Sequence, residues 1–231
     1  MRTRTRYDIN YLLILLAVLF TIISLGYRFS MKPVALITKV VQEVDKKTES
    51  VDWKKATKGE SLVSGDEVRT GKKSLAIIKF LDNSILRVRE QSSLKINSEG
   101  NAKTVEIENG GLGFDIQKQK QNEQFKFTSP TSVASIRGTK GKISHAGDGD
   151  ILIVTEGTVN LKNNTSGNDV DVTAGTIGFS NSDGTVSSRK ATQQELADAT
   201  SAATGGSNNE LNLEMKDSRG SKKELKFKYK K

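Results

Sequence analysis

Few side chains in this sequence could carry out acid–base, nucleophilic or metal chemistry. The chain of 231 residues has no Cys and a single His, His145. Without Cys there is no disulfide, thiolate zinc site, iron–sulfur cluster or cysteine nucleophile. A single His also argues against a histidine metal cage and against a Ser-His-Asp hydrolase. We therefore expect no catalytic residues, no metal and no cofactor.

The remaining motifs with recognisable chemistry fit loops better than sites. Asp148-Gly149-Asp150 offers two carboxylates for calcium, but the other ligands of an EF-hand loop are missing, so we interpret it as a hairpin turn. His145 is predicted to lie at a strand end. Asn163-Asn164-Thr165-Ser166 contains glycosylation sequons and is also typical of a polar turn.

The net charge of +9 is distributed unevenly along the chain. Residues 1–32 carry five basic residues against one acidic residue, and residues 211–231 carry eight against three. The intervening residues are therefore neutral overall. A nucleic-acid-binding protein concentrates positive charge on the folded surface that contacts phosphates. We therefore expect no nucleic-acid partner.

An uncharged apolar run of 17 residues extends from Tyr11 to Tyr27. As a helix it would span about 26 Å, and Ile9 and Phe29 extend it towards the bilayer core thickness of about 30 Å. The sequence therefore predicts a single-pass transmembrane helix over residues 11–29.

The flanks of this run predict its orientation. Residues 1–10 carry three arginines and form a cytoplasmic stub, because positive residues next to a span stay inside. A linker over residues 30–36 then leads to a domain outside the membrane. The alternative is a cleaved signal peptide with Ser24-Leu25-Gly26 near its cleavage site.

Beyond the linker the sequence predicts an all-β domain. Short alternating or β-branched runs recur about every 8–12 residues, separated by Gly, Asp and Asn. No amphipathic helix separates them, which excludes a βαβ arrangement. Asp82-Asn83 is predicted to form a two-residue hairpin turn, because both residue types tolerate positive φ. The predicted strands are Ala35–Val44, Val68–Thr70, Leu75–Phe80, Ser84–Val88, Ser93–Ile96, Lys103–Ile107, Leu112–Ile116, Gln124–Phe127, Gly141–His145, Ile151–Thr155, Thr158–Leu161, Asp169–Val172 and Thr176–Phe179.

The composition changes within residues 191–231. Thr192 and Glu195 form a capping-box pattern and predict a short helix to about Ala203, followed by a Gly/Ser linker. Two alternating segments then predict a basic β-hairpin, which could add to a sheet edge of this chain or of a partner. Its lysines either contact an anionic polymer or form a solvated face that blocks edge aggregation. The candidate polymer contacts are Lys222, Lys223, Lys226, Lys228 and Lys230.

Several motifs in the middle of the chain follow one another in a distinctive order. They are Trp53, Gly59–Leu62, Gly65–Gly71, Phe80–Ser84, Asn109–Leu112, Phe127–Thr139, Val154–Val159 and Val172–Gly175. This set, centred on Arg137-Gly138-Thr139, resembles the extracytoplasmic domain of the FecR family, named after the ferric-citrate regulator. The resemblance covers about residues 37–180. Asn83 stands where the family usually has Gly, and Asn109–Leu112 matches a family turn.

The residues of these motifs have physical roles that we interpret as structural. Asp66 is expected to accept backbone N–H bonds in its turn. Trp53 is expected to fill the core, with sugar stacking as the alternative. Arg137 is expected to be semi-buried against carbonyls or a carboxylate, with Glu156 and Asp66 as candidate partners and ligand contact as the alternative. The set is Trp53, Gly65, Asp66, Pro130, Arg137, Gly138, Thr139, Glu156, Gly157 and Gly175, whose glycines are placed at turns.

The resemblance implies a two-sheet sandwich or flattened β-roll over residues 37–190, anchored in a bacterial inner membrane with the domain in the periplasm. FecR regulators carry a cytoplasmic domain that controls a sigma factor, for which residues 1–10 are too short. The leading hypothesis is therefore a non-enzymatic envelope module that binds a protein partner. The alternatives are binding to cell-wall or anionic polymer, and signalling with a separate cytoplasmic partner.

Overall fold

The computed structural model describes residues 11, 13–18, 32–205, 210–216 and 222–228. It divides into two compact units, Met1–Lys32 and Pro33–Lys231. Residues 11 and 13–18 of the first unit are helical, with exposed side chains. No helix within the described ranges has the length and apolar character needed to cross a membrane. Most of the span predicted over residues 11–29 lies outside the described residues.

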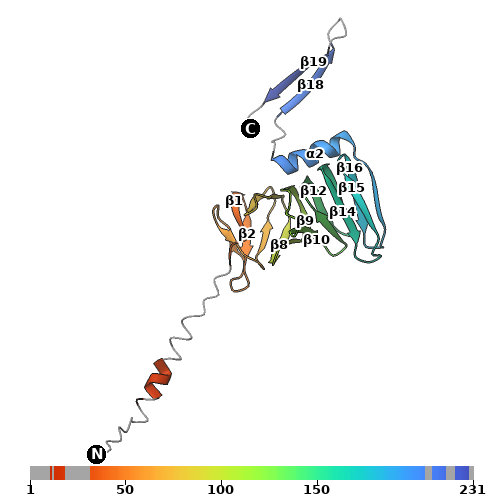
Figure 1. Ribbon diagram of the computed structural model, residues 1–231. Coiled ribbons are helices and arrows are strands. Elements are labelled where there is room, and N and C mark those ends of the chain that lie inside the picture. The colour runs from red at the N-terminus through yellow and green to blue at the C-terminus, as the bar shows by residue number, and fades with distance from the viewer. Residues whose placement is uncertain (1–10, 12, 19–31, 206–209, 217–221, 229–231) are drawn as a thin grey trace, which may run out of the picture. The chain divides into compact units, whose positions relative to one another are not determined.

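The second unit contains an open sheet of 17 strands that folds into two facing layers (Figure 1). In layer A the neighbouring strands are, in order, β4 (Ser61–Leu62), β1 (Ala35–Val41), β6 (Leu75–Phe80), β7 (Ile85–Val88), β9 (Ala102–Ile116), β12 (Thr139–Ala146), β13 (Gly149–Glu156), β16 (Thr176–Asn181) and β17 (Val186–Lys190). In layer B they are β3 (Lys54–Lys55), β2 (Val44–Lys47), β5 (Glu67–Thr70), β8 (Ser93–Glu99), β9 again, β10 (Gln124–Thr128), β11 (Ser132–Ile136), β14 (Thr158–Asn163) and β15 (Asp169–Thr173).

Strand β9 belongs to both layers. Its first half pairs with β8 and with β10 in layer B, and its second half pairs with β7 and β12 in layer A. Gly110 bends the strand between the halves with φ +84°, where an added Cβ would lie 2.6 Å from the Gln91 carbonyl oxygen. The turn predicted at Asn109–Leu112 is therefore wrong, because the chain bends here without reversing. The two strands predicted on either side are one strand.

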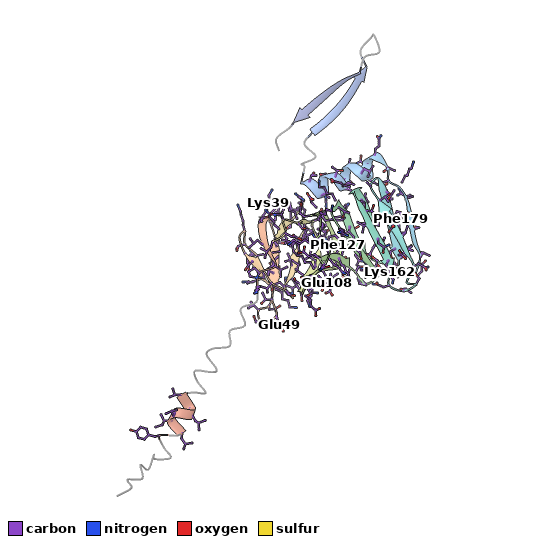
Figure 2. The ribbon with its side chains drawn as sticks, in the orientation of Figure 1. Lys39, Glu49, Glu108, Phe127, Lys162 and Phe179 are labelled. Atoms are coloured by element: carbon purple, nitrogen blue, oxygen red, sulfur yellow. The ribbon has the colours of Figure 1, made fainter. Side chains whose placement is uncertain are left out.

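The core lies between the layers, and aromatic pairs connect the two layers across it. Phe80 of layer A contacts Phe125 of layer B with ring centroids 5.2 Å apart, and Phe114 contacts Phe127 at 5.1 Å. Figure 2 shows Phe127 within the body of the domain. Side chains along β6, β7 and β8 alternate between buried and partly exposed, as expected of strands with one face in a core. The predicted all-β class is confirmed.

The hairpin between β6 and β7 differs in detail from its prediction. The loop has three residues, Leu81, Asp82 and Asn83, because the Phe80 N–H bonds the Ser84 carbonyl oxygen. Only Asn83 has positive φ, at 68°, which is the left-handed position of a three-residue hairpin. The Asp82 carboxylate instead accepts the Ser84 N–H and pairs with Lys103 at 2.8 Å.

Five strands, β2, β3, β4, β11 and β17, were not among the predicted ones. The predicted strand Ala35–Val44 ends at Val41, because Gln42 has positive φ of 58°, and β2 begins at Val44. The strands β3 and β4 have two residues each, too few to show a period, and β17 is largely exposed. Strand β11 lies inside the family signature, where its alternation is hidden among small residues. After the sheet, β18 (Glu210–Lys216) and β19 (Lys222–Lys228) form the predicted hairpin, with Leu213 opposite Leu225.

Helix α2 (Gln193–Thr204) begins as the sequence predicts. The Thr192 hydroxyl accepts the Glu195 N–H, and the Glu195 carboxylate accepts the Thr192 N–H at 2.8 Å. Arg189 adds a bidentate pair to that carboxylate at 2.7 and 3.0 Å. These bonds, with that to Arg189 the strongest, lower the pKa of Glu195 to about 2.

The helix lies across β9, β12 and β13 on the outer face of layer A (Figure 1). Its buried side chains are Ala199, Ala202 and Ala203, which are small enough for a close approach. Gly113 of β9 completes the fit, because an added Cβ would lie 2.0 Å from the Ala202 carbonyl oxygen. The helix therefore rests directly on the strand backbone.

We predict that the contribution of the Glu195 cap to the free energy of unfolding is lost at acidic pH. Its folded pKa of about 2 lies below the ordinary 4.5, so the stabilisation is complete above pH 4.5 and disappears as the pH falls to about 2. The free-energy difference between wild type and Glu195→Gln in urea unfolding should vanish over that window. Glu49→Gln, at an exposed residue in a distant part of the chain, is the control for the loss of one carboxylate and should change stability little at neutral pH. A constant difference would contradict the capping role.

We also predict that Gly113→Ala displaces α2. The overpacking should cost about 2 kcal/mol or more in urea unfolding and should speed amide exchange across residues 193–204. Gly167→Ala is the control, because the added Cβ of Gly167 meets nothing within 4 Å, although Gly167, unlike Gly113, has positive φ. It should lower stability without changing exchange in the helix. Unchanged exchange in Gly113→Ala would refute the close contact.

Candidate functional site

The motif glycines lie where the chain crosses between the layers. Gly138 connects β11 to β12, Gly157 connects β13 to β14, and Gly175 connects β15 to β16. All three have positive φ, as does Gly65 before β5. Thr139 is buried beside Gly157, with its Cγ2 2.5 Å from the position of an added Cβ. This part of the signature builds the crossings.

Arg137 does not have the predicted environment. Its side chain is exposed, and neither candidate carboxylate pairs with it. Glu156 pairs with Lys140 at 2.8 Å, and Asp66 pairs with Lys46 at 2.9 Å. The prediction failed because Arg137 directly follows the buried Ile136 of β11, and the alternation of the strand turns its side chain outward. Arg137 instead lines a polar pocket of about 560 Å³ on layer B, so ligand contact by Arg137 stays a prediction.

Trp53 is also placed differently from its prediction. The side chain is half-buried at the surface, and the Arg69 guanidinium lies 4.2 Å from its ring centroid. Asp45 fixes that guanidinium through two hydrogen bonds of 3.0 Å. Trp53 therefore stabilises the β2–β5 surface of layer B through a cation–π contact. The Arg69 guanidinium occupies one face of the indole ring, which sugar stacking would need.

Asp66 forms the turn that the sequence predicts and a buried ion pair that it does not. Its carboxylate accepts the Val63 N–H at 2.8 Å and pairs with Lys46, and both side chains are almost fully buried. Lys46 also donates to the Ser61 carbonyl oxygen at 2.7 Å. The pair thus ties β2 to the β4–β5 turn.

A buried polar cluster occupies the other end of the domain. Asp150, at the start of β13, lies 2.8 Å from His145 Nδ1. Its second oxygen accepts the hydroxyls of Ser129 at 2.5 Å, Ser132 at 2.6 Å and Thr131. The hydroxyls contact the carboxylate and not the imidazole, so no nucleophile–base pair exists. The cluster fixes the turn that contains Pro130. The predicted strand-end position of His145 is confirmed, and a hairpin turn is present, but it consists of Gly147 and Asp148, so Gly149 and Asp150 belong to β13 and not to the predicted turn.

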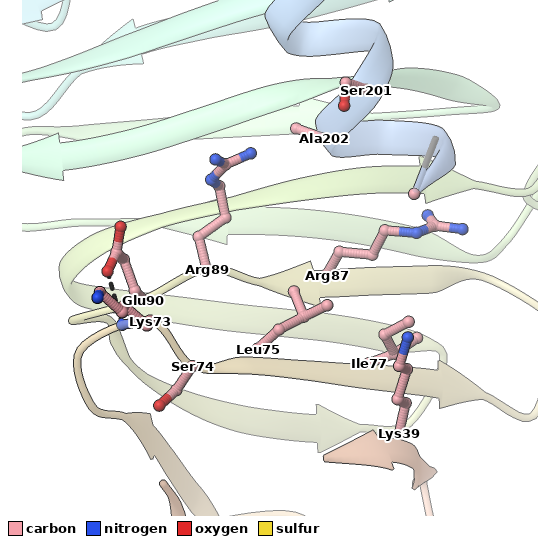
Figure 3. Close-up of a pocket in the computed structure, with 11 residues that line it drawn as sticks. Lys39, Lys73, Ser74, Leu75, Ile77, Arg87, Arg89, Glu90, Ser201 and Ala202 are labelled. Carbon is pink, nitrogen blue, oxygen red and sulfur yellow. Dashed lines mark hydrogen bonds between the residues drawn. The ribbon is translucent and has the colours of Figure 1, made fainter. Parts of the chain in front are cut away.

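A group of positively charged side chains lies beside the C-terminal end of α2 (Figure 3). A pocket of about 400 Å³ opens on the outer face of layer A. We call it the cationic pocket. It is lined by Lys39, Lys73, Ser74, Leu75, Ile77, Arg87, Arg89, Glu90, Ser201, Ala202 and Gly205.

The register of three strands builds this pocket. Lys39 of β1 lies opposite Ile77 of β6, which lies opposite Arg87 of β7. Leu75 and Arg89 follow two positions away on β6 and after β7, so they point to the same outer side. Leu75 and Ile77 therefore form an apolar stripe on β6, which is flanked by cations on both sides, as Figure 3 shows.

Arg87 is the most constrained residue of the cationic pocket. Its guanidinium donates to the Ala203 carbonyl oxygen at the end of α2, where the helix dipole favours positive charge. Gly205 closes over Arg87 Nε, since an added Cβ would lie 2.9 Å from that atom. Burial lowers the pKa of Arg87, while Asp115 acts in the opposite direction. An arginine still keeps its charge near neutral pH.

The described residues contain no group of three or more His, Asp or Glu side chains able to hold a metal ion. The tail lysines Lys222, Lys223, Lys226 and Lys228 lie on β19, and Lys230 lies outside the described residues. Polymer contact by these lysines stays a prediction.

Comparison with known proteins agrees with the layered β fold. Residues 66–160 match the family described as FecR protein. These residues form a FecR domain. The match begins at Asp66 and contains strand β9, the crossings at Gly138 and Gly157 and the run Arg137-Gly138-Thr139, whereas Lys46 and Gly175 lie outside it. No curated protein matches the chain.

Two crystal structures, at 2.50 and 1.65 Å resolution, are similar in fold. Both are of a candidate anti-sigma factor from Parabacteroides distasonis, with a TM-score of 0.50 and 12% sequence identity. The similarity covers 57% of this chain and 62% of that protein. At this identity the likeness establishes the fold alone.

Sequence reasoning missed Lys39, Arg87 and Arg89 as a group. The local signal was present, because Arg87 and Arg89 flank the buried Val88 and must face outward. Their proximity to Lys39 depends on the β1–β6–β7 register, which no local pattern specifies.

We predict that Asp150→Asn destabilises the FecR domain strongly. The amide has a single oxygen, so its NH2 group must face either the three hydroxyls or His145 Nδ1, and the negative charge that all four groups contact is lost. About 3 kcal/mol should therefore be lost in urea unfolding. Asp148→Asn, two residues away on the exposed turn, is the matched control and should change stability little. Equal stability of the two variants would show that the cluster is not a structural anchor.

Proposed function

We infer that this chain is a non-enzymatic, membrane-anchored protein of the bacterial envelope whose FecR domain binds a protein partner. The observation that carries the inference is the cationic pocket on a FecR domain, where Lys39, Arg87 and Arg89 have no carboxylate partner among the described residues. A rigid β framework presenting unpaired cations around an apolar stripe is suited to binding, and the buried polar cluster lacks the geometry of a catalytic site.

The proposed location follows from the N-terminal sequence. The apolar run from Tyr11 to Tyr27 supports an anchor in the inner membrane, and the arginines before it support a cytoplasmic N-terminus. The FecR domain would then work in the periplasm. Residues 1–10 would form the cytoplasmic stub, residues 30–36 the linker, and residues 191–231 the helix and basic hairpin.

A second candidate is a signalling regulator that acts with a separate cytoplasmic partner. The fold likeness to a candidate anti-sigma factor favours it. In that case replacing the anchor with an unrelated transmembrane helix should abolish the output while leaving partner binding intact. Binding of the basic hairpin to cell-wall or other anionic polymer is a further outcome that the experiment below distinguishes.

The first experiment is photo-crosslinking of the full-length protein in its native envelope. We predict that a photoreactive residue on at least one outer face yields a discrete protein adduct, identified by mass spectrometry. Suitable positions are Leu75 in the cationic pocket, Ile151 elsewhere on layer A, and Lys162 on layer B. Adducts with polymer alone, or no adduct from any of these positions, would overturn the proposed function.

A further inference from the structure

We propose that the cationic pocket binds an acidic peptide segment of the protein partner, with one apolar side chain of that segment on β6 and carboxylates on the flanking cations. This inference rests on the proposed function and names the chemistry of its partner. The residues that carry it are Lys39, Leu75, Ile77, Arg87 and Arg89.

The charge balance of the pocket favours an anionic ligand. Its lining includes the cations Lys39, Lys73, Arg87 and Arg89 against one carboxylate, Glu90. That carboxylate is already engaged, because it accepts the Lys73 N–H at 2.7 Å. No carboxylate within the described part of the chain forms an ion pair with Lys39, Arg87 or Arg89, although Asp115 influences Arg87 at longer range.

The spacing of the pocket suits a peptide. Lys39, Ile77 and Arg87 lie opposite one another on adjacent strands, so the two cations are about 10 Å apart at their Cα atoms, with Ile77 between them. A peptide lying along β6 could place an apolar side chain over Leu75 and Ile77 and direct carboxylates to both sides. A guanidinium offers a carboxylate two parallel hydrogen bonds, which the exposed Arg89 is free to supply.

The same features argue against other ligands. A uniformly charged polymer would leave the apolar Leu75–Ile77 stripe facing charge. The chain's own tail is an unsuitable occupant, because residues 211–231 carry eight basic residues against three acidic ones. An acidic segment with apolar residues matches both the cations and the stripe.

The pocket is also held in shape before any ligand arrives. The Arg87 guanidinium is fixed to the Ala203 carbonyl oxygen, and the Arg89 N–H donates to the Gly111 carbonyl oxygen at 3.0 Å. Little side-chain freedom at Arg87 and little backbone freedom at Arg89 are then left to lose on binding, which favours affinity.

The test is a charge-reversal series in the crosslinking experiment on the full-length chain. With the photoreactive residue at position 75, the captured protein peptide should be rich in Asp and Glu. The double variant Lys39→Glu/Arg89→Glu should lower the adduct yield by about tenfold or more, and added salt should lower it as well. This pair avoids Arg87, so α2 keeps its contact. Lys126→Glu/Lys162→Glu on layer B is the matched control and should leave the yield unchanged.

The outcomes separate this inference from the proposed function. Capture of a basic or neutral peptide at position 75, or a yield unaffected by Lys39→Glu/Arg89→Glu, overturns the acidic-peptide assignment alone. The same holds if only the probes at Ile151 or Lys162 capture a protein. If no probe captures a protein, both the acidic-peptide assignment and the proposed function are wrong. Circular dichroism of each variant confirms that the comparison is between folded proteins.

Discussion

The domain depends on one strand that has to serve two sheets. Strand β9 supplies hydrogen-bonding edges to β8 and β10 in one layer and to β7 and β12 in the other. The bend at Gly110 makes this possible, because a side chain there would collide with the Gln91 backbone. With the layers joined in this way, Phe114 and Phe127 meet across the core. A substitution that straightened β9 would therefore disrupt its pairing with β8 and β10 and its pairing with β7 and β12 at the same time.

The same strand also determines which part of layer A remains available to a ligand. Gly113 draws α2 onto β9, β12 and β13, so the helix ends beside β7 and leaves the outer faces of β1 and β6 uncovered. Arg87 lies at that boundary and bonds the last turn of the helix. The cationic pocket is thus a consequence of where the helix stops, and its cations come from strands chosen by the sheet register.

The sequence was most informative where structure is set by neighbouring residues. The capping box at Thr192, the Asp66 turn and the left-handed position of Asn83 each depend on a few adjacent atoms, and the structure has all three. Trp53 and Arg137 were misplaced because their surroundings come from strands distant in the sequence. The cationic pocket could not be predicted for the same reason. Its residues span positions 39 to 205, and only the strand pairing brings them together.

The position of α2 after the sheet has a consequence for a chain that is synthesised from its N-terminus. All strands of both layers precede residue 193, so the layers can assemble while the backbone at Gly113 is still uncovered. During that interval the face offers a smooth surface to any neighbouring chain, which is a route to misassembly. Once α2 packs on this face, Gly113 is covered. The helix would therefore protect the sheet only in a late step of folding, so the time at which it packs matters as much as its contacts.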